Sequence, residues 1–205
     1  MSFFNQLKNR TLGWWHDVPI PPHENDAAPT FQAWHRYNPL RTKWDSTSSN
    51  TSAETGPGKD GSASKDTKFV LATWNVDAAA LAPEARISAL ISHIQNMDGQ
   101  PDIIFLQEVS HPALSRLLEL TWIREFWYSS EADTTNWGTW PFTNITLISK
   151  ERFNMKPNPA TKKNDMAGLD RVWRVKYPSR FGRDALCCDI LLPSTFPSSP
   201  GTGDS

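Results

Sequence analysis

The chain has few cysteines and no apolar run long enough to cross a membrane. Its two cysteines are the neighbours Cys187 and Cys188, which point to opposite faces of a strand and make a poor disulfide framework. Met1–Lys8 has no apolar core of signal length, and no later run approaches the roughly 20 apolar residues of a membrane span. We therefore expect a soluble intracellular protein, of the nucleus or cytoplasm, with reduced thiols and no membrane partner.

The chain also lacks an excess of charge of either sign. Its formal charge of -1 over 205 residues gives no global sign of nucleic-acid binding, although a local basic patch stays open. The composition changes sharply along the chain, and the Ser/Thr/Gly-rich stretch before Lys68 has too few apolar residues to offset its ordering entropy. We predict a Trp/Pro-rich lead-in at 1–45, a disordered linker at 46–67, one domain at 68–192 and a disordered tail at 193–205.

Two apolar, β-prone runs and a helix between them form the clearest pattern. Phe69–Val76 and Asp102–Val109 are typical of buried strands, and Pro83–Asn96 has the apolar spacing of a helix that faces a sheet. The apolar stripe of that helix consists of Ile87, Leu90, Ile91 and Ile94. The pattern predicts a right-handed, parallel βαβ unit and an α/β fold.

Each of these strands ends in a polar residue, Asn75 in the first and Glu108 in the second. The carboxyl ends of parallel strands share one edge of a sheet, where ligands usually bind. A lone carboxylate with water and phosphate suits Mg²⁺, and Asn75 beside it could hold a phosphate oxygen or position the carboxylate. On spacing alone the structural alternatives are favoured: Glu108 as a solvated strand end and Asn75 as a turn former.

The remaining elements follow from periodicity and turn residues. Ser110 can cap a second helix that ends near Thr121. Residues 122–140 show no clean period, and we expect a strand plus a long loop there. Further strands are expected at Gln32–Tyr37, at Phe142–Ser149, and in a hairpin of Arg171–Tyr177 with Asp184–Leu192.

The sequence around Asn75 and Glu108 resembles the opening motifs of the endonuclease/exonuclease/phosphatase superfamily, and is most similar to its 5′-tyrosyl-DNA phosphodiesterases. The resemblance covers about residues 68–192. It is carried by Thr73–Asp77, Leu81, Arg86 and Pro101–Val109, and more weakly by Phe142–Leu147 and Gly182–Cys188. It implies that Glu108 binds a catalytic Mg²⁺, with Mn²⁺ as an alternative, and that Asn75 is a catalytic residue contacting the metal-bound phosphate. The implied substrate is nucleic acid or another phosphodiester.

The resemblance also implies residues that this sequence does not contain. The family's later Gly-Asp-x-Asn segment orients the attacking water, and its Ser-Asp-His segment stabilises the phosphate; neither occurs here. The family fold is a four-layer α/β/β/α sandwich of the DNase-I-like type, so the chain corresponds to its first half and is expected to be incomplete. An in-line displacement without a base or phosphate clamp loses several orders of magnitude in rate.

Three interpretations follow. In the first, the complete form hydrolyses phosphodiester or 5′-phosphotyrosyl bonds and this chain is impaired or inactive. In the second, the chain is a non-catalytic remnant that binds nucleic acid or protein through aromatic residues of 122–140, although these rings are more often core and rim. In the third, it is the product of a premature stop or a mispredicted exon boundary. The substrate class stays open because abasic-site nucleases, RNA deadenylases and lipid phosphatases share both motifs, and the oligomeric state is open too.

Overall fold

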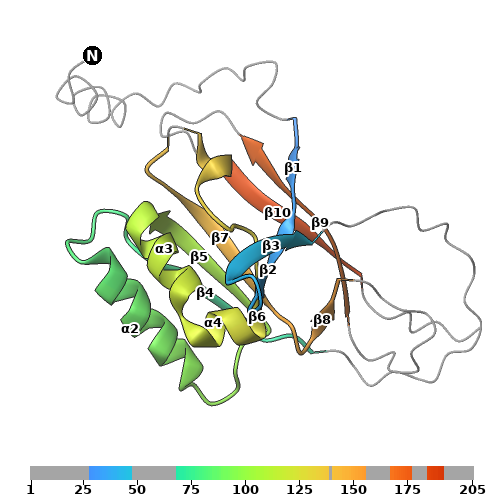
Figure 1. Cartoon of the computed structure of the whole chain (residues 1–205), viewed down its shortest axis with the longest axis horizontal. Helices are drawn as coiled ribbons and strands as arrows, with labels where there is room; N and C mark the ends of the chain where they lie inside the picture. Colours follow the sequence, from blue (N-terminus) through green and yellow to red (C-terminus); the bar gives the residue numbers. More distant parts are fainter. Residues whose placement is uncertain (1–27, 48–67, 139, 156–166, 177–183, 192–205) are drawn as a thin grey trace, which may run out of the picture.

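The computed structural model describes residues 28–47, 68–138, 140–155, 167–176 and 184–191 (Figure 1). Within these residues the chain is mixed α/β, with two sheets and few helices. The expected tail, nearly all of the expected linker and the expected hairpin turn lie outside the described residues.

The larger sheet has six strands and contains the predicted βαβ unit. Strands β4 and β5 pair in parallel, and each other neighbouring pair in this sheet is antiparallel. In spatial order the strands are β3 (Lys43–Thr47), β2 (Trp34–Asn38), β6 (Trp127–Ser129), β7 (Phe142–Ser149), β5 (Ile103–Ser110) and β4 (Leu71–Asn75). Strand β4 is therefore an edge of this sheet among the described strands.

The smaller sheet has four strands and is built around β9 (Ala167–Lys176). Strand β9 pairs antiparallel with β1 (Thr30–Gln32) and with β10 (Asp184–Leu191), and in parallel with the short β8 (Phe153–Asn154). The predicted hairpin between β9 and β10 is confirmed. Its first strand starts four residues earlier than expected, because Ala167 pairs with Phe153 of β8.

Helices cover one face of the larger sheet. Helix α2 (Pro83–Gln95) matches the predicted helix and buries the predicted stripe, since Ile87, Leu90, Ile91 and Ile94 are all buried. Helix α3 (His111–Glu119) has Ser110 at its N-cap position as predicted, but the serine side chain makes no capping hydrogen bond. Helix α4 (Thr121–Phe126) was not predicted.

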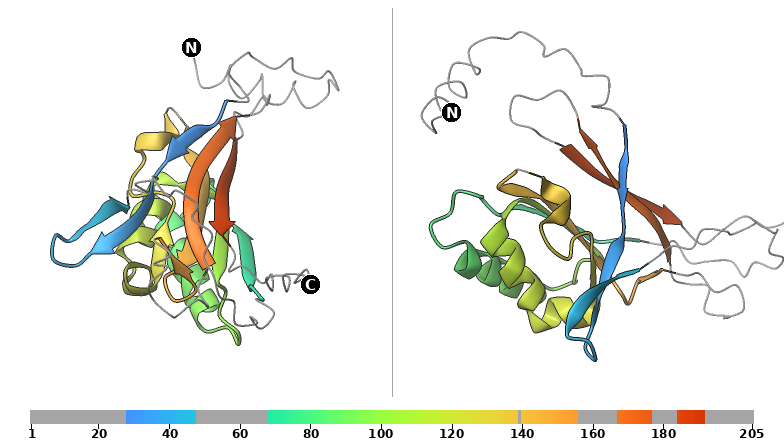
Figure 2. Two further views of the ribbon diagram at one scale, coloured as in Figure 1. Left: turned by 90° about the vertical axis from the view of Figure 1, so that its right-hand side faces the viewer. Right: turned by 45° about the horizontal axis from the view of Figure 1, so that its top comes forward.

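The described elements form three layers, with the larger sheet between the helices and the smaller sheet (Figures 1 and 2). One core lies between the larger sheet and the helices, and the other lies between the two sheets. Successive side chains of a strand point to opposite faces, so Ile145 and Leu147 of β7 pack on the helices, whereas Ile148 packs on the smaller sheet. A chain that corresponds to only half of a two-sheet sandwich, as the resemblance implies, is expected to expose an apolar face on strands such as β7. The structure corrects this expectation for β7, because the smaller sheet covers the face opposite the helices.

Part of the expected lead-in belongs to the sheets. The expected strand at Gln32–Tyr37 is divided at Ala33, with β1 in the smaller sheet and β2 in the larger one. Trp34 is buried between the sheets, and Trp44 packs against the helix-side core and donates from Nε1 to the Leu118 carbonyl over 3.2 Å. Strand β3 runs to Thr47, so the expected start of the linker at residue 46 needs correction.

Residues 122–140 contain more regular structure than predicted. Trp122 lies in α4, the strand β6 follows, and a 3₁₀ turn, η2 (Thr135–Trp137), interrupts the loop. Trp127, Tyr128 and Trp137 are buried in the cores, whereas Trp140 is exposed. Most of these rings are therefore packing residues.

The cysteines follow the prediction, because both are free and neither is fully buried. Cys188 packs on the core between the sheets, and burial, with smaller effects of Asp189 and Cys187, raises the pKa of its thiol to about 11. Among the helices that the structure describes, none has the length and apolar character needed to span a membrane.

Candidate functional site

The ends of β4 and β5 bring the two predicted site residues to one edge of the larger sheet. Asn75 is the Cα partner of Gln107 in the parallel ladder, which places it beside the residue that precedes Glu108. The Val76 amide continues the pairing and donates to the Gln107 carbonyl over 2.8 Å. The predicted parallel pair is confirmed, and both polar residues stand at its carboxyl end.

The backbone after β4 fixes the orientation of the Asn75 amide. Its Oδ1 accepts a hydrogen bond of 2.8 Å from the Asp77 amide, which is an Asx turn, and Asp77 takes a left-handed φ of 67°. Asp77 Oδ1 in turn accepts from the Ala79 amide over 3.1 Å. The expected alternative of a turn former is thus part of what Asn75 does. Because Oδ1 is engaged, Nδ2 is the end of this exposed side chain that can donate to a ligand.

Glu108 lies in a β-bulge. Leu106 pairs with Ile145 and Val109 with Thr143, so Gln107 and Glu108 together face the single residue Asn144. Leu106 and Val109 consequently both pack on the helix side, although three positions separate them. Glu108 itself is half-buried and has a left-handed φ of 54°. A non-glycine residue in this conformation is strained by about 1–3 kcal/mol and persists where its surroundings determine it. The bulge re-aims the one side chain that was predicted to bind a cation.

Arg86 adds a positive charge near the end of β4. From the first turns of α2, its Nε donates to the carbonyl of Val76, the residue that follows Asn75. The rest of the guanidinium keeps further N–H groups, in a fork that suits phosphate oxygens. In the sequence, Arg86 was noted only as part of the resemblance, because the helical pattern does not show that its side chain turns back to the strand.

An aromatic cluster follows the end of β5. The His111 ring packs against Trp137 with centroids 4.7 Å apart, and His111 Nε2 lies 3.2 Å from the Trp140 carbonyl. Of the other described histidines, His93 packs on Trp74 and His35 lies in β2. No local pattern singles out His111, because its aromatic surroundings come from a loop about 30 residues further along the chain.

The donor set at this edge fits a cation held by a single protein carboxylate. In the part of the chain that the structure describes, no three His, Cys, Asp or Glu side chains gather as metal ligands would. Mg²⁺ is commonly bound by one or two carboxylates, with water and substrate phosphate completing its shell. Glu108 could supply one such group, and the Asn75 amide and the Arg86 guanidinium have N–H groups of the kind that donate to phosphate.

Comparison of the chain with models of protein families, with curated proteins and with solved structures finds no match.

Proposed function

We propose that the shared edge of β4 and β5 is the phosphate and metal site of a Mg²⁺-dependent phosphodiesterase, acting on nucleic-acid phosphodiester or 5′-phosphotyrosyl bonds. The observation that carries the proposal is that the polar ends of two adjacent parallel strands meet there, one of them re-aimed by a bulge. Bulges are enriched beside active sites, and strand carboxyl ends are the usual place for ligands in such sheets.

Each residue has a distinct role in this proposal. The Glu108 carboxylate holds Mg²⁺ or Mn²⁺, which when bound neutralises charge on the phosphoryl group. Asn75 donates from Nδ2 to a phosphate oxygen, since its Oδ1 is already used by the Asp77 amide. Arg86, anchored on the Val76 carbonyl, attracts the anionic substrate to the same edge.

The order of layers supports the finer fold assignment. A layer of helices, a mixed sheet and a second sheet packed on it are three of the four layers of an α/β/β/α sandwich of the DNase-I-like type. In this proposal the chain supplies the first half of such a sandwich. The groups that orient water and clamp the phosphate are the Gly-Asp-x-Asn and Ser-Asp-His segments, which are absent from its 205 residues.

Cation binding and hydrolysis test the proposal separately. Titration of the purified chain with Mn²⁺, followed by electron paramagnetic resonance, should show a site that Glu108→Gln abolishes and Glu151→Gln, a change at an exposed glutamate, leaves intact. Hydrolysis of single-stranded, abasic or 5′-tyrosyl DNA with Mg²⁺ should stay at trace level, since no base is positioned by these motifs.

One result would contradict the proposed metal site, and another would contradict only the expected lack of activity. Mn²⁺ binding that is unchanged in Glu108→Gln would remove Glu108 from the metal site. Hydrolysis at ordinary enzyme rates that Glu108→Gln abolishes would instead keep the site and show that the chain contains its own base and clamp.

The second interpretation, a non-catalytic binding remnant, depends on exposed rings in residues 122–140. Trp127, Tyr128 and Trp137 are packed in the cores, which leaves Trp140 and Phe126 as the exposed aromatic side chains of this segment. The same titrations would favour this interpretation if single-stranded DNA bound with micromolar, salt-sensitive affinity that Glu108→Gln preserved and Trp140→Ala removed.

A further inference from the structure

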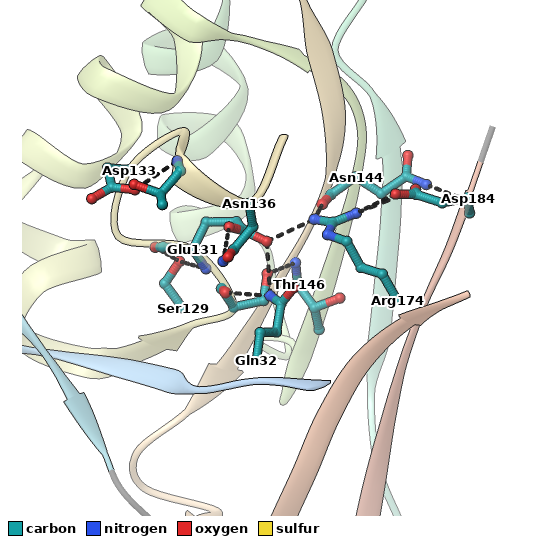
Figure 3. A network of polar contacts seen from close by, with 11 residues as sticks. Gln32, Ser129, Glu131, Asp133, Asn136, Asn144, Thr146, Arg174 and Asp184 are labelled. Carbon is teal, nitrogen blue, oxygen red and sulfur yellow. Dashed lines mark hydrogen bonds and ion pairs between the residues drawn. The ribbon is translucent and has the colours of Figure 1, made fainter. Parts of the chain in front are cut away.

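A buried ion-pair network joins the two sheets next to the bulge that carries Glu108 (Figure 3). Its centre is Arg174 of β9, which is 6 % exposed, and its main partner is Glu131, which is fully buried. Arg174 Nη2 lies 2.7 Å from Glu131 Oε1, and Nη1 lies 3.1 Å from Asp184 Oδ2. Charges are buried at a cost of several kcal/mol each, so such a network needs several well-placed hydrogen bonds.

The network is well satisfied on the carboxylate side. Glu131 Oε1 also accepts from Gln32 Nε2 over 2.8 Å, and its Oε2 accepts from Asn136 Nδ2 over 3.2 Å. Figure 3 shows these groups converging from β1, the loop after β6, and β9. The Glu131 carboxylate is thereby held by groups from segments that are distant in sequence, which fixes its position opposite the guanidinium.

The third partner of Arg174 is Asn144, the residue opposite the bulge. Thr146 pairs with Ser130 through both its backbone groups, because its carbonyl accepts from the Ser130 amide and its amide donates to Ser130 Oγ. Asn144, two residues earlier, presents its carbonyl to the same side of β7. Strand β6 pairs antiparallel with β7 but ends before it reaches Asn144, so no backbone amide of β6 bonds the Asn144 carbonyl. Arg174 Nη2 donates to this carbonyl in place of a strand, over 2.8 Å.

The side chain of Asn144 is tied to the same group of residues. Its Nδ2 donates to the Asp184 carbonyl over 3.4 Å, so both the backbone and the side chain of Asn144 are anchored on residues of the network. On its other edge, Asn144 is the single residue that faces both Gln107 and Glu108. Immobilising Asn144 therefore constrains the bulge from the β7 side.

We propose that Arg174 is a positioning residue for Glu108: by clamping Asn144 to the Glu131–Asp184 network, it fixes the bulge that holds Glu108 in its left-handed conformation. The part of this inference that concerns cation binding rests on the proposed function of the β4–β5 edge. The part that concerns the bulge does not.

Two variants of Arg174 test the proposal. Arg174→Lys keeps the charge opposite Glu131, but a lysine ammonium lacks the planar fork that reaches Glu131, Asp184 and Asn144 together. The double variant Arg174→Met with Glu131→Gln removes both charges, so that no charge of this pair is left buried and alone. The matched control is Arg171→Met, which removes the ion pair of 2.7 Å between Arg171 and Asp189 on the same two strands without touching Asn144.

The first readout is the backbone of Glu108, followed by the Cα and Cβ chemical shifts and the amide coupling of that residue in isotope-labelled protein. We expect left-handed values in the wild type and in Arg171→Met, and a shift toward extended values in both Arg174 variants. The second readout is Mn²⁺ affinity, which should fall by about 10-fold or more in the Arg174 variants, the lower end of the loss seen when supports of metal ligands are removed.

The outcomes distinguish the positioning role of Arg174 from the proposed function of the β4–β5 edge. Unchanged Glu108 shifts in folded Arg174 variants, or an equal change in Arg171→Met, would overturn the positioning role. A wild type that shows no Mn²⁺ binding would refute the proposed function of the edge, and the Glu108 shifts would still decide whether Arg174 holds the bulge. A fall in Mn²⁺ affinity with unchanged Glu108 shifts would also overturn the proposal, because it would assign the loss to charge alone.

Discussion

His35 of β2 is the residue in the described chain whose titration bears most directly on stability near neutral pH. Burial lowers its pKa below the ordinary value of 6.5, and this effect outweighs the nearby carboxylates of Glu131 and Asp133 and the backbone of Ser129 and Ser130, which raise it. The folded state therefore binds a proton at His35 less readily than the unfolded state does. The stability that depends on a neutral His35 is fully present above pH 6.5. It is lost progressively as the pH falls below that value.

We expect the free energy of unfolding, measured by urea denaturation, to decrease between pH 7.5 and pH 5.5 in the wild type. In His35→Gln the decrease should be smaller, because glutamine does not titrate. If the free energy of unfolding decreased equally in the two proteins, burial of His35 would not be the cause of the pH dependence between pH 7.5 and pH 5.5.

At this scale the sequence placed the two candidate residues but not their supports. The positions of Asn75 and Glu108 at the ends of adjacent strands could be predicted because each closes an apolar run, which is a local pattern. The bulge could not, because Gln107 and Glu108 continue the strand pattern and the extra residue appears only in the register with β7. Arg174 reads in sequence as the polar position of an alternating strand, and its burial depends on Glu131, 43 residues away.

At the scale of elements, the hairpin of β2 and β3 is held to the fold by large aromatic side chains. Trp34 is almost completely buried between the sheets. Trp34→Ala should lower the free energy of unfolding by about 3–5 kcal/mol, since it removes a large buried ring and leaves a cavity. Leu40→Ala, in the exposed turn of the same hairpin, should change it by less than about 0.5 kcal/mol.

Urea denaturation of both variants measures this difference. A loss below about 1 kcal/mol for Trp34→Ala would mean that the hairpin contributes little to the cooperative unit. A loss in the expected range would make β2 and β3 integral to the domain.

Elements with local signals were predicted well, and those fixed by distant partners were not. Helix α2 and strand β7 match their predictions closely because their apolar periods are long. Helix α4 has only six residues, too few for a period to show. The split between β1 and β2 depends on pairing with β9 in one sheet and with β6 in the other, which no local pattern around Ala33 encodes.

For the whole molecule, the free edge of the larger sheet is the main association risk in the described structure. Among the described strands, β4 pairs only with β5, and Val70, Leu71 and Trp74 on or beside it are exposed. An exposed apolar edge strand is a template for pairing with another chain, and a lysine on the edge suppresses such pairing. We expect concentration-dependent association that Leu71→Lys reduces.

Sedimentation velocity over a tenfold or wider range of concentration measures this effect. Leu40→Lys, which adds the same charge at an exposed leucine away from β4, is the control and should leave association unchanged. If both substitutions reduced association equally, the reduction would be due to the added net charge and not to the β4 edge. A wild type that stays monomeric throughout would show that the β4 edge is protected.

The pairing of the first described strand also determines when the protein can finish folding during its synthesis. Gln32, which ends β1, bonds the carbonyl of Ser130, 98 residues further along the chain. At ordinary rates of roughly 5–20 residues per second, that partner leaves the ribosome about 5–20 s after Gln32. Strand β1 therefore waits for its later partner β9, and the β2–β3 hairpin waits for β6, while the βαβ unit, whose contacts are closer in sequence, is already complete. Nascent chains whose emerged part extends beyond β5 but ends before residue 130 should show β1 protease-sensitive next to a protected α2.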